Sequence, residues 1–182
     1  MRRFLTAATC LAAALLMSPV PAHAVTESSK AHASAASSTV ERRTTKVRVT
    51  YPSAIRRGSP VRFTFTVTRP DQIDDEALVL ETDLPHGIVS KVRFVTKPRG
   101  AKCGAQKRNS AGNYGVYCVV RSLDYTKITM SFNVWLKSSY YGKFRASHYW
   151  APVTLDYGGS IGDYLDEITR DDLIGRGWVK VR

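Results

Sequence analysis

The stretch Val61-Arg62-Phe63-Thr64-Phe65-Thr66-Val67-Thr68-Arg69 decides the fold class of this 182-residue chain. Apolar side chains occupy every second position of the stretch, and polar side chains occupy the positions between them. This period of two predicts a β-strand that buries one face in a core and exposes the other to water. Residues 128–136 repeat the pattern, with apolar side chains alternating against Thr129, Ser131, Asn133 and Trp135.

Shorter segments of the same kind follow at intervals along the chain. They are residues 46–51, 77–81, 91–96, 115–121 and 143–150. Turn-forming sequences such as Arg57-Gly58-Ser59-Pro60 and Leu84-Pro85-His86-Gly87 separate them. Because short strands follow one another without any long helical period, the sequence predicts an all-β fold, an antiparallel β-sandwich of about seven strands.

The first 24 residues have the three parts of an export signal. Arg2 and Arg3 supply a cationic start, residues 4–17 are apolar, and Ala22-His23-Ala24 offers a small-residue cleavage site. We expect cleavage after Ala24 and a secreted, extracellular product. The paired arginines also leave the twin-arginine route open beside the general one. No later segment has the roughly 18 apolar residues of a membrane-spanning helix, so no transmembrane segment is expected.

Two cysteines remain once the signal and its Cys10 are removed. An even pair in an exported chain predicts one disulfide, between Cys103 and Cys118. The bridge would close a loop of about 15 residues and contribute roughly 3 kcal/mol to stability. Zinc binding is the competing interpretation, but the chain has neither a second cysteine pair nor a histidine at ligand spacing. No metal and no cofactor are therefore expected.

Composition divides the exported part into three segments. Residues 25–45 are rich in Ala, Ser and Thr without apolar periodicity, which predicts a flexible arm. The end of this arm could serve as a spacer or pair with the sheet edge of a partner. Residues 46–150 form the predicted sandwich, and residues 151–182 form a short C-terminal extension, helical or irregular, that packs on the sandwich or continues it.

The extension differs from the rest of the chain in its charge. It holds six acids against four bases, although the whole chain carries a net charge of +12. Asp156 and Glu167 stand at the first and twelfth positions of a calcium-loop window, but Gly158, Ser160 and Ile161 stand where oxygen ligands and a glycine are needed. A short capped helix around residues 163–169 is the better prediction.

The basic excess lies in residues 25–150. It favours a polyanionic partner, such as a polymer of the cell envelope, or serves only as a solvated exterior. Tyr and Trp are common at binding interfaces and also fill sandwich cores. The candidate interface residues, basic and aromatic, are Arg42, Arg43, Arg56, Arg57, Lys97, Arg99, Lys102, Lys107, Arg108, Tyr140, Tyr141 and Trp150. A nucleic-acid partner is disfavoured because the protein is exported and lacks an RNA-binding motif.

No motif indicates catalysis. His148 lies in the aromatic segment Ala146-Ser147-His148-Tyr149-Trp150, where a packed histidine is a better interpretation than a general base. No serine or cysteine has the context of a nucleophile. The sequence predicts a protein that is not an enzyme and has no catalytic residues.

Several motifs together resemble a known family. They are Asp83-Leu84-Pro85-His86-Gly87-Ile88, then Cys103, then residues 115–123 around Cys118, and then the alternating strand from Ile128. In this order they resemble the Ig-like repeat domain of bacterial surface and secreted proteins, with Arg69-Pro70-Asp71-Gln72 in place of that family's Asn-x-Gly turn. The resemblance covers residues 46–150 and implies an Ig-like sandwich that serves in extracellular scaffolding or adhesion.

Three functions follow from these features. The first is a secreted, non-enzymatic binding or adaptor module, which joins an extracellular protein complex and binds a protein partner. The alternative is a basic effector that attaches to anionic polymers of the cell envelope or acts against bacteria. The third is an inhibitor of extracellular proteases, based on the size, the disulfide and the exposed turns.

Overall fold

The computed structural model describes residues 35–42, 45–68, 76–121, 126–154 and 159–182. The predicted signal and the first part of the predicted arm, up to residue 34, lie outside these ranges. In the described part of the chain, strands form two sheets, and the only α-helix has six residues. No helix there is long and apolar enough to span a membrane.

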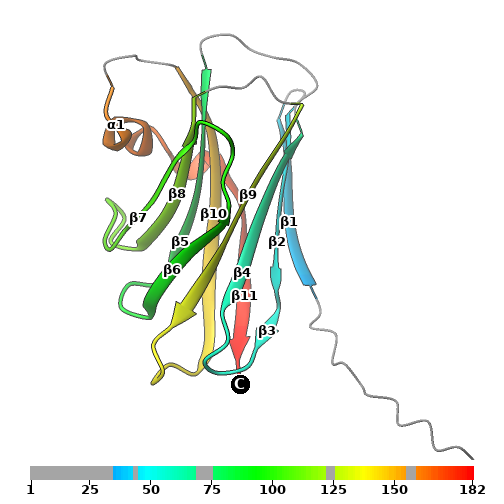
Figure 1. Ribbon diagram of the computed structural model, residues 1–182, viewed down its shortest axis with the longest axis vertical. Helices are drawn as coiled ribbons and strands as arrows, with labels where there is room; N and C mark the ends of the chain where they lie inside the picture. Colours follow the sequence, from blue (N-terminus) through cyan, green and yellow to red (C-terminus); the bar gives the residue numbers. More distant parts are fainter. Residues whose placement is uncertain (1–34, 43–44, 69–75, 122–125, 155–158) are drawn as a thin grey trace, which may run out of the picture. The chain divides into compact units, whose positions relative to one another are not determined.

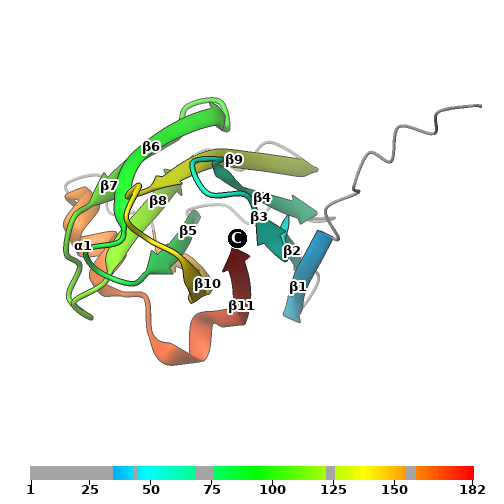
Figure 2. The same ribbon diagram turned by 90° about the horizontal axis from the view of Figure 1, so that it is seen from below.

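Two sheets face one another, as Figures 1 and 2 show from two directions. The first sheet contains, in spatial order, β1 (Ala35–Arg42), β2 (Thr45–Pro52), β4 (Val61–Thr68), β9 (Lys127–Leu136) and β6 (Val89–Thr96). The second contains β3 (Ala54–Ile55), β11 (Leu173–Val181), β10 (Gly142–Thr154), β5 (Glu76–Leu84), β8 (Tyr114–Val120) and β7 (Lys102–Gln106). Neighbours are antiparallel except β3 and β11, which pair in parallel. The all-β sandwich is confirmed, with more strands than the seven predicted.

The core lies between the sheets and follows the predicted alternation. Along β4, the side chains at 61, 63, 65 and 67 are buried, and those between them are partly or fully exposed. Phe63 lies directly opposite Phe132 of β9, and their stacked rings are 5.5 Å apart. From the second sheet, the ring of His148 lies 5.4 Å from Phe63. Aromatic contacts therefore join both sheets at the centre of the core.

The predicted flexible arm differs from the structure in residues 35–42. These residues form β1, which pairs with β2 from Ala35 opposite Pro52 to Arg42 opposite Thr45. Ala36 and Val40 pack against the core from alternate positions. Their alternation is masked in the sequence because Ala, Ser and Thr provide most of the side chains. One edge of β1 is thus paired with β2, and β1 forms an outer edge of the molecule's own sheet.

The C-terminal extension is part of the fold. Helix α1 (Ile161–Asp166) begins after Ser160, whose side chain accepts a hydrogen bond from the Asp163 amide in a capping box, so the helix starts two residues before the predicted 163–169. Tyr164 and Leu165 cover the outer face of the upper second sheet in Figure 1. The chain then forms the 3₁₀ turn η1 (Arg170–Asp172) and returns as β11.

Two glycines of β11 allow the second sheet to approach the first. A Cβ at position 175 would lie 2.7 Å from the Ser38 hydroxyl of β1, and one at 177 would overlap the Tyr51 ring of β2. Tyr51 is buried and its ring contacts Phe63 and His148. Gly177 is therefore needed where the sandwich closes, because any side chain there would displace a core aromatic.

The predicted disulfide between Cys103 and Cys118 is present. The two residues lie directly opposite one another on β7 and β8, so the bridge joins neighbouring strands of one sheet. Cys118 is buried and Cys103 packs against the core. The bridge ties the short edge strand β7 to the sheet.

Replacing both cysteines by alanine should lower the free energy of unfolding by about 3 kcal/mol, because the unfolded chain regains the freedom of a 15-residue loop. Chemical denaturation of the oxidised protein and the variant measures this difference. Wild-type protein kept in reductant is the control and should unfold at the same denaturant concentration as the variant. Equal midpoints for oxidised wild type and variant would contradict the prediction.

Gly177→Ala should destabilise the fold by about 2 kcal/mol, since its methyl group competes with the Tyr51 ring for one space. Thermal unfolding followed by circular dichroism provides the measurement. In Gly177→Ala/Tyr51→Ala the space is vacated, so the double variant should lose less than the sum of the two single losses. Strict additivity would show that the two residues do not compete.

Candidate functional site

Three chain segments meet at the lower end of the sandwich in Figure 1: the β3–β4 turn, the β9–β10 turn and the end of β11. The Arg57 amide donates a hydrogen bond to the Arg182 carbonyl at 2.7 Å, and the Lys180 amide donates to the Ser53 carbonyl at 2.9 Å. The Arg57 side chain donates to the Ser138 carbonyl of the β9–β10 turn. These three hydrogen bonds fix the three segments relative to one another.

Exposed cations and two exposed aromatic side chains gather on these segments. We call this group the basic end; its members are Arg56, Arg57, Lys137, Tyr141, Lys143, Arg145, Trp178, Lys180 and Arg182. Strand alternation directs them outward, because the inward residues Phe144, Val179 and Val181 are buried in the core. The group therefore lies on regular, hydrogen-bonded strands and on the turns next to them.

The register between β10 and β11 places the four side chains of the basic end that lie within these strands in two rows. Lys143 lies directly opposite Lys180, and Arg145 lies directly opposite Trp178. The guanidinium carbon of Arg145 is 5.9 Å from the centroid of the indole ring, a cation–π contact. Successive rows on one face of a strand are about 7 Å apart. The face thus presents an aromatic ring between fixed positive charges.

A cavity of about 550 Å³ opens beside the rows. It is lined by Ser53, Ala54, Lys143, Trp178, Lys180 and Arg182. No acid is among these lining residues, and their hydroxyl, ammonium, guanidinium and indole groups can all donate hydrogen bonds. Trp178 is 58% exposed and Tyr141 is 79% exposed. An anion that enters the cavity would meet donors and positive charge from several directions.

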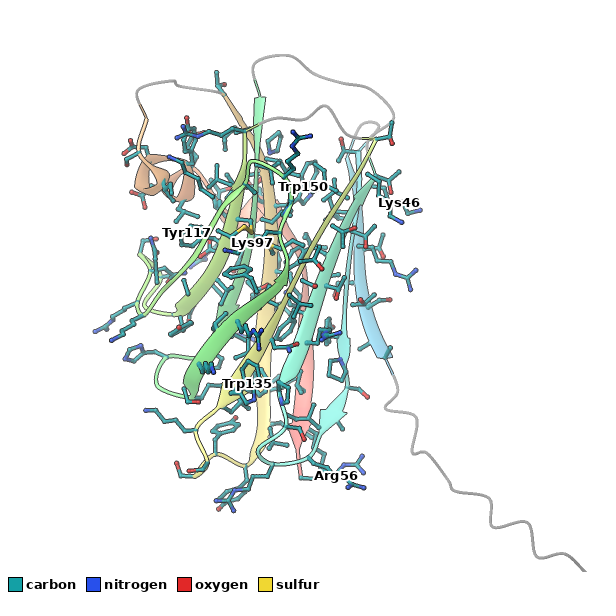
Figure 3. All side chains as sticks on the ribbon, viewed as in Figure 1. Lys46, Arg56, Lys97, Tyr117, Trp135 and Trp150 are labelled. Carbon is teal, nitrogen blue, oxygen red and sulfur yellow. A yellow bond between two sulfur atoms is a disulfide. The ribbon has the colours of Figure 1, made fainter. Side chains whose placement is uncertain are left out.

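The structure brings together only some of the candidate interface residues. Arg56, Arg57, Tyr140 and Tyr141 lie at the basic end, where the Tyr140 hydroxyl donates to the Lys143 carbonyl. A second group, Lys97, Arg99 and Lys102, lies at the β6–β7 turn, and a third, Lys107 and Arg108, lies at the β7–β8 turn. Figure 3 shows Arg56 at the lower end, Lys46 near the upper end and Lys97 between them.

Three candidates do not contribute to the described surface. Trp150 is 3% exposed and packs in the core, so its proposed interface role is wrong. It lies on the inward face of β10, which the sequence could not distinguish from the outward face among so many aromatics. The Arg42 side chain and the whole of Arg43 lie outside the described residues.

Sequence reasoning missed Trp178, Lys180 and Arg182. They alternate with Val179 and Val181, and this period of two marks a half-buried strand. The signal was available, but the acids of residues 151–172 dominated the composition of the segment. Lys143 and Arg145 were included in a predicted strand, and only the register with β11 brings them to the aromatic ring.

His148 is a core residue. It is fully buried among aromatic rings, and its Nδ1 lies 3.1 Å from the Thr82 hydroxyl. Burial lowers the pKa of His148 from 6.5 to about 3, because a charged imidazole would lose its hydration. The imidazole is therefore neutral at physiological pH and has no access to a substrate, in agreement with the packed histidine predicted.

A second polar cluster lies away from the basic end. Glu81 and Asp83 of β5 are buried side by side on the outer face, under the β7–β8 turn. The Asn109 amide donates to Glu81 at 3.2 Å and to Asp83 at 2.6 Å, and the Asn113 amide donates to Asp83 at 3.1 Å. Burial and then the neighbouring Asp83 raise the pKa of Glu81 from 4.5 to about 7, and burial raises the pKa of Asp83.

A raised carboxyl pKa is also typical of active sites. Here the carboxyl oxygens are engaged by the amides that hold the turn, and the adjoining cavity is only about 150 Å³. Pockets for small molecules are typically about 300 Å³ or larger. The pair therefore anchors the β7–β8 turn. In the described part of the chain, no group of three or more His, Cys, Asp or Glu side chains could hold a metal ion.

Comparisons with known proteins assign the chain to no family. No family model and no curated protein matches the chain. Among solved structures, a cohesin module from a Clostridium perfringens family 33 glycoside hydrolase is similar, with a TM-score of 0.47, 10% identity, and coverage of 75% of this chain and 95% of that one. The C-terminal domain of the Streptococcus agalactiae AgI/II polypeptide BspA gives a TM-score of 0.45 at 6% identity. That match covers 81% of this chain and 49% of the other, so the chain spans about half its length.

Glu81→Gln should change the pH dependence of stability. Between pH 4.5 and about 7 the folded state keeps the Glu81 proton that the unfolded state has lost, so raising the pH through this window destabilises wild type. The variant lacks this effect, and its free energy of unfolding should gain up to about 3 kcal/mol relative to wild type from pH 4.5 to pH 8. Denaturant titrations at several pH values test this.

Glu167→Gln removes an exposed carboxyl near the same turn and is the matched control. Its free energy of unfolding should stay within about 0.5 kcal/mol of wild type at every pH. If the free energies of unfolding of Glu81→Gln and wild type change with pH in the same way, the shared burial of the two carboxyls has no thermodynamic effect.

Proposed function

We propose that this protein is an exported, non-enzymatic binding module that attaches to a polyanion through the basic end. The observation that carries the proposal is the cavity beside Trp178, whose lining provides three cationic side chains and no acid. The basic end has further exposed cations at positions 56, 57, 137 and 145. This arrangement suits a long anionic ligand, which can contact several charges at once.

The Lys143–Lys180 pair supports a binding role more directly than net charge does. Two like charges directly opposite one another on adjacent antiparallel strands destabilise a sheet. The fold therefore does not need these side chains, and an anion placed between them would relieve their repulsion. Lysine and arginine are cationic throughout the neutral pH range, so the surface is ready to bind without a protonation step.

Export and a role without catalysis are the remaining parts of the proposal. The N-terminal 24 residues have the pattern of a cleavable signal, and the disulfide fits an oxidising compartment. His148 and the Thr82 hydroxyl 3.1 Å from its ring are both fully buried, so neither is accessible to a substrate. A protein partner is the first hypothesis from the sequence. At one edge of the first sheet, β6 has two register shifts and carries Lys91 and Arg93, features that protect an edge from strand addition, and β1 forms the other edge.

The test compares two charge-reversed variants of equal net charge. Lys143→Glu/Lys180→Glu alters the basic end, and Lys97→Glu/Lys102→Glu alters the second basic group, which the sequence had singled out. Affinity for a sulfated glycan such as heparin and for polyphosphate is measured by calorimetry at 50 and 200 mM salt. We expect the first variant to lose at least tenfold in affinity and the second less than threefold. Wild-type affinity should fall about tenfold or more over this salt range.

Equal losses in both variants would show that net charge, and not the basic end, governs binding. Binding that salt does not weaken would indicate apolar contacts and would also overturn the proposal. Both variants should remain folded, because all four lysines are exposed and the double reversal only exchanges one like-charged cross-strand pair for another.

A further inference from the structure

We infer that the polyanion is an acidic glycan, whose sugar ring stacks on Trp178 while its acidic groups pair with Arg145 and with Lys143 and Lys180. The inference rests on the proposed function and assigns the ligand class of that same site. Its starting point is the large apolar ring at the centre of a cationic surface, which charge attraction alone does not explain.

Trp178 is 58% exposed on a regular strand. Large aromatic side chains contribute most when they are buried, and an exposed one surrounded by polar groups marks a contact site. Trp178 lies on β11, and neighbouring strands pair with β11 on both sides: β10 along its length, and β3 near its end at Lys180 and Val181. Its ring is therefore a fixed platform that loses little conformational freedom when a ligand binds.

The spacing of the rows fits a ligand that alternates flat rings with acidic groups. The row of Arg145 and Trp178 is followed two residues along by the row of Lys143 and Lys180, about 7 Å away. The electron-rich indole face attracts the polarised C–H groups on the face of a sugar ring, in the way it attracts a cation. The ammonium and guanidinium groups are then within reach of a carboxylate, sulfate or phosphate attached to that ring or to its neighbour.

The location of the ring disfavours the other polyanions. A membrane-binding tryptophan projects from a loop or a helix into the lipid interface, but Trp178 lies within a strand beside a cavity. Polyphosphate has no ring to stack. Single-stranded nucleic acid does stack on aromatic rings, but the predicted export removes the protein from its usual location.

The experiment uses the full mature chain with Trp178→Ala, Trp178→Phe and a matched control, Trp135→Ala. Trp135 lies on the other sheet, has Lys91 5.4 Å from its ring centroid, and lines a cavity with Lys137 of the basic end. A loss in Trp135→Ala equal to that in Trp178→Ala would therefore overturn the assignment of the stacking ring to Trp178. The probes are a heparin-derived hexasaccharide, an oligogalacturonate, polyphosphate, oligo-dT and phosphatidylglycerol vesicles. Calorimetry gives affinities, and circular dichroism confirms folding.

We expect Trp178→Ala to weaken binding of at least one of the two acidic oligosaccharides about tenfold and to change polyphosphate affinity less than twofold. Trp178→Phe should recover most of the loss, and Trp135→Ala should match wild type. If Lys143→Glu/Lys180→Glu abolishes glycan binding but Trp178→Ala does not affect it, the glycan assignment fails and the proposed function stands. If wild type binds none of the five probes, the proposed function itself fails. Tighter binding of oligo-dT or vesicles than of both glycans, with loss in Trp178→Ala, would overturn the assignment in favour of nucleic acid or lipid.

Discussion

The packing of inward-facing side chains between the two sheets is the interaction on which the rest of the structure depends. It fixes which side chain of every strand points to the core, and therefore also fixes which side chains point to solvent. On β11 the buried residues Val179 and Val181 oblige Trp178 and Lys180 to face outward. A shift of one residue would place charge in the core and the valines in water, so the register of the binding surface is protected by the stability of the fold.

The same packing divides the outer face of the second sheet into two regions. In the upper region, Val79 and Val119 are covered by α1, so β5 is apolar on both faces. In the lower region no helix intervenes, and the cations of β10 and β11 are exposed. The described exposed acids gather on α1, its C-cap and η1, away from the basic end; they are Asp163, Asp166, Glu167 and Asp171. The acids therefore lie apart from the basic end, although Lys107 and Arg108 of the β7–β8 turn and Arg170 of η1 place cations near them.

Sequence reasoning recovered the features that depend on local pattern. The alternation at Val61–Thr68, the disulfide and the capped helix each have a signal within a few neighbouring residues. It failed where the outcome depends on distant contacts. Residues 35–42 have little apolar content, and they form β1 because β2 offers a full row of hydrogen-bonding partners. The basic end could not be assembled from sequence, since its members come from three segments that meet only through the register of β11 with β10 and β3.

The two buried titratable sites act on stability in opposite directions. The buried His148 lowers the free energy of unfolding as the pH falls below 6.5. Below that pH the unfolded chain protonates His148, whereas the folded core does not accept this proton until about pH 3. Glu81 favours the folded state over much of the same range, because it keeps its proton up to about pH 7. Between pH 4.5 and 6.5 these two contributions have opposite signs, and Asp83, whose pKa burial also raises, acts in the same direction as Glu81. The residues that line the cavity include no histidine, aspartate or glutamate, so acidification in this range leaves the charge of the binding surface unchanged. In this range, pH would therefore alter the attraction between the cavity and an anion only through the charge of the ligand.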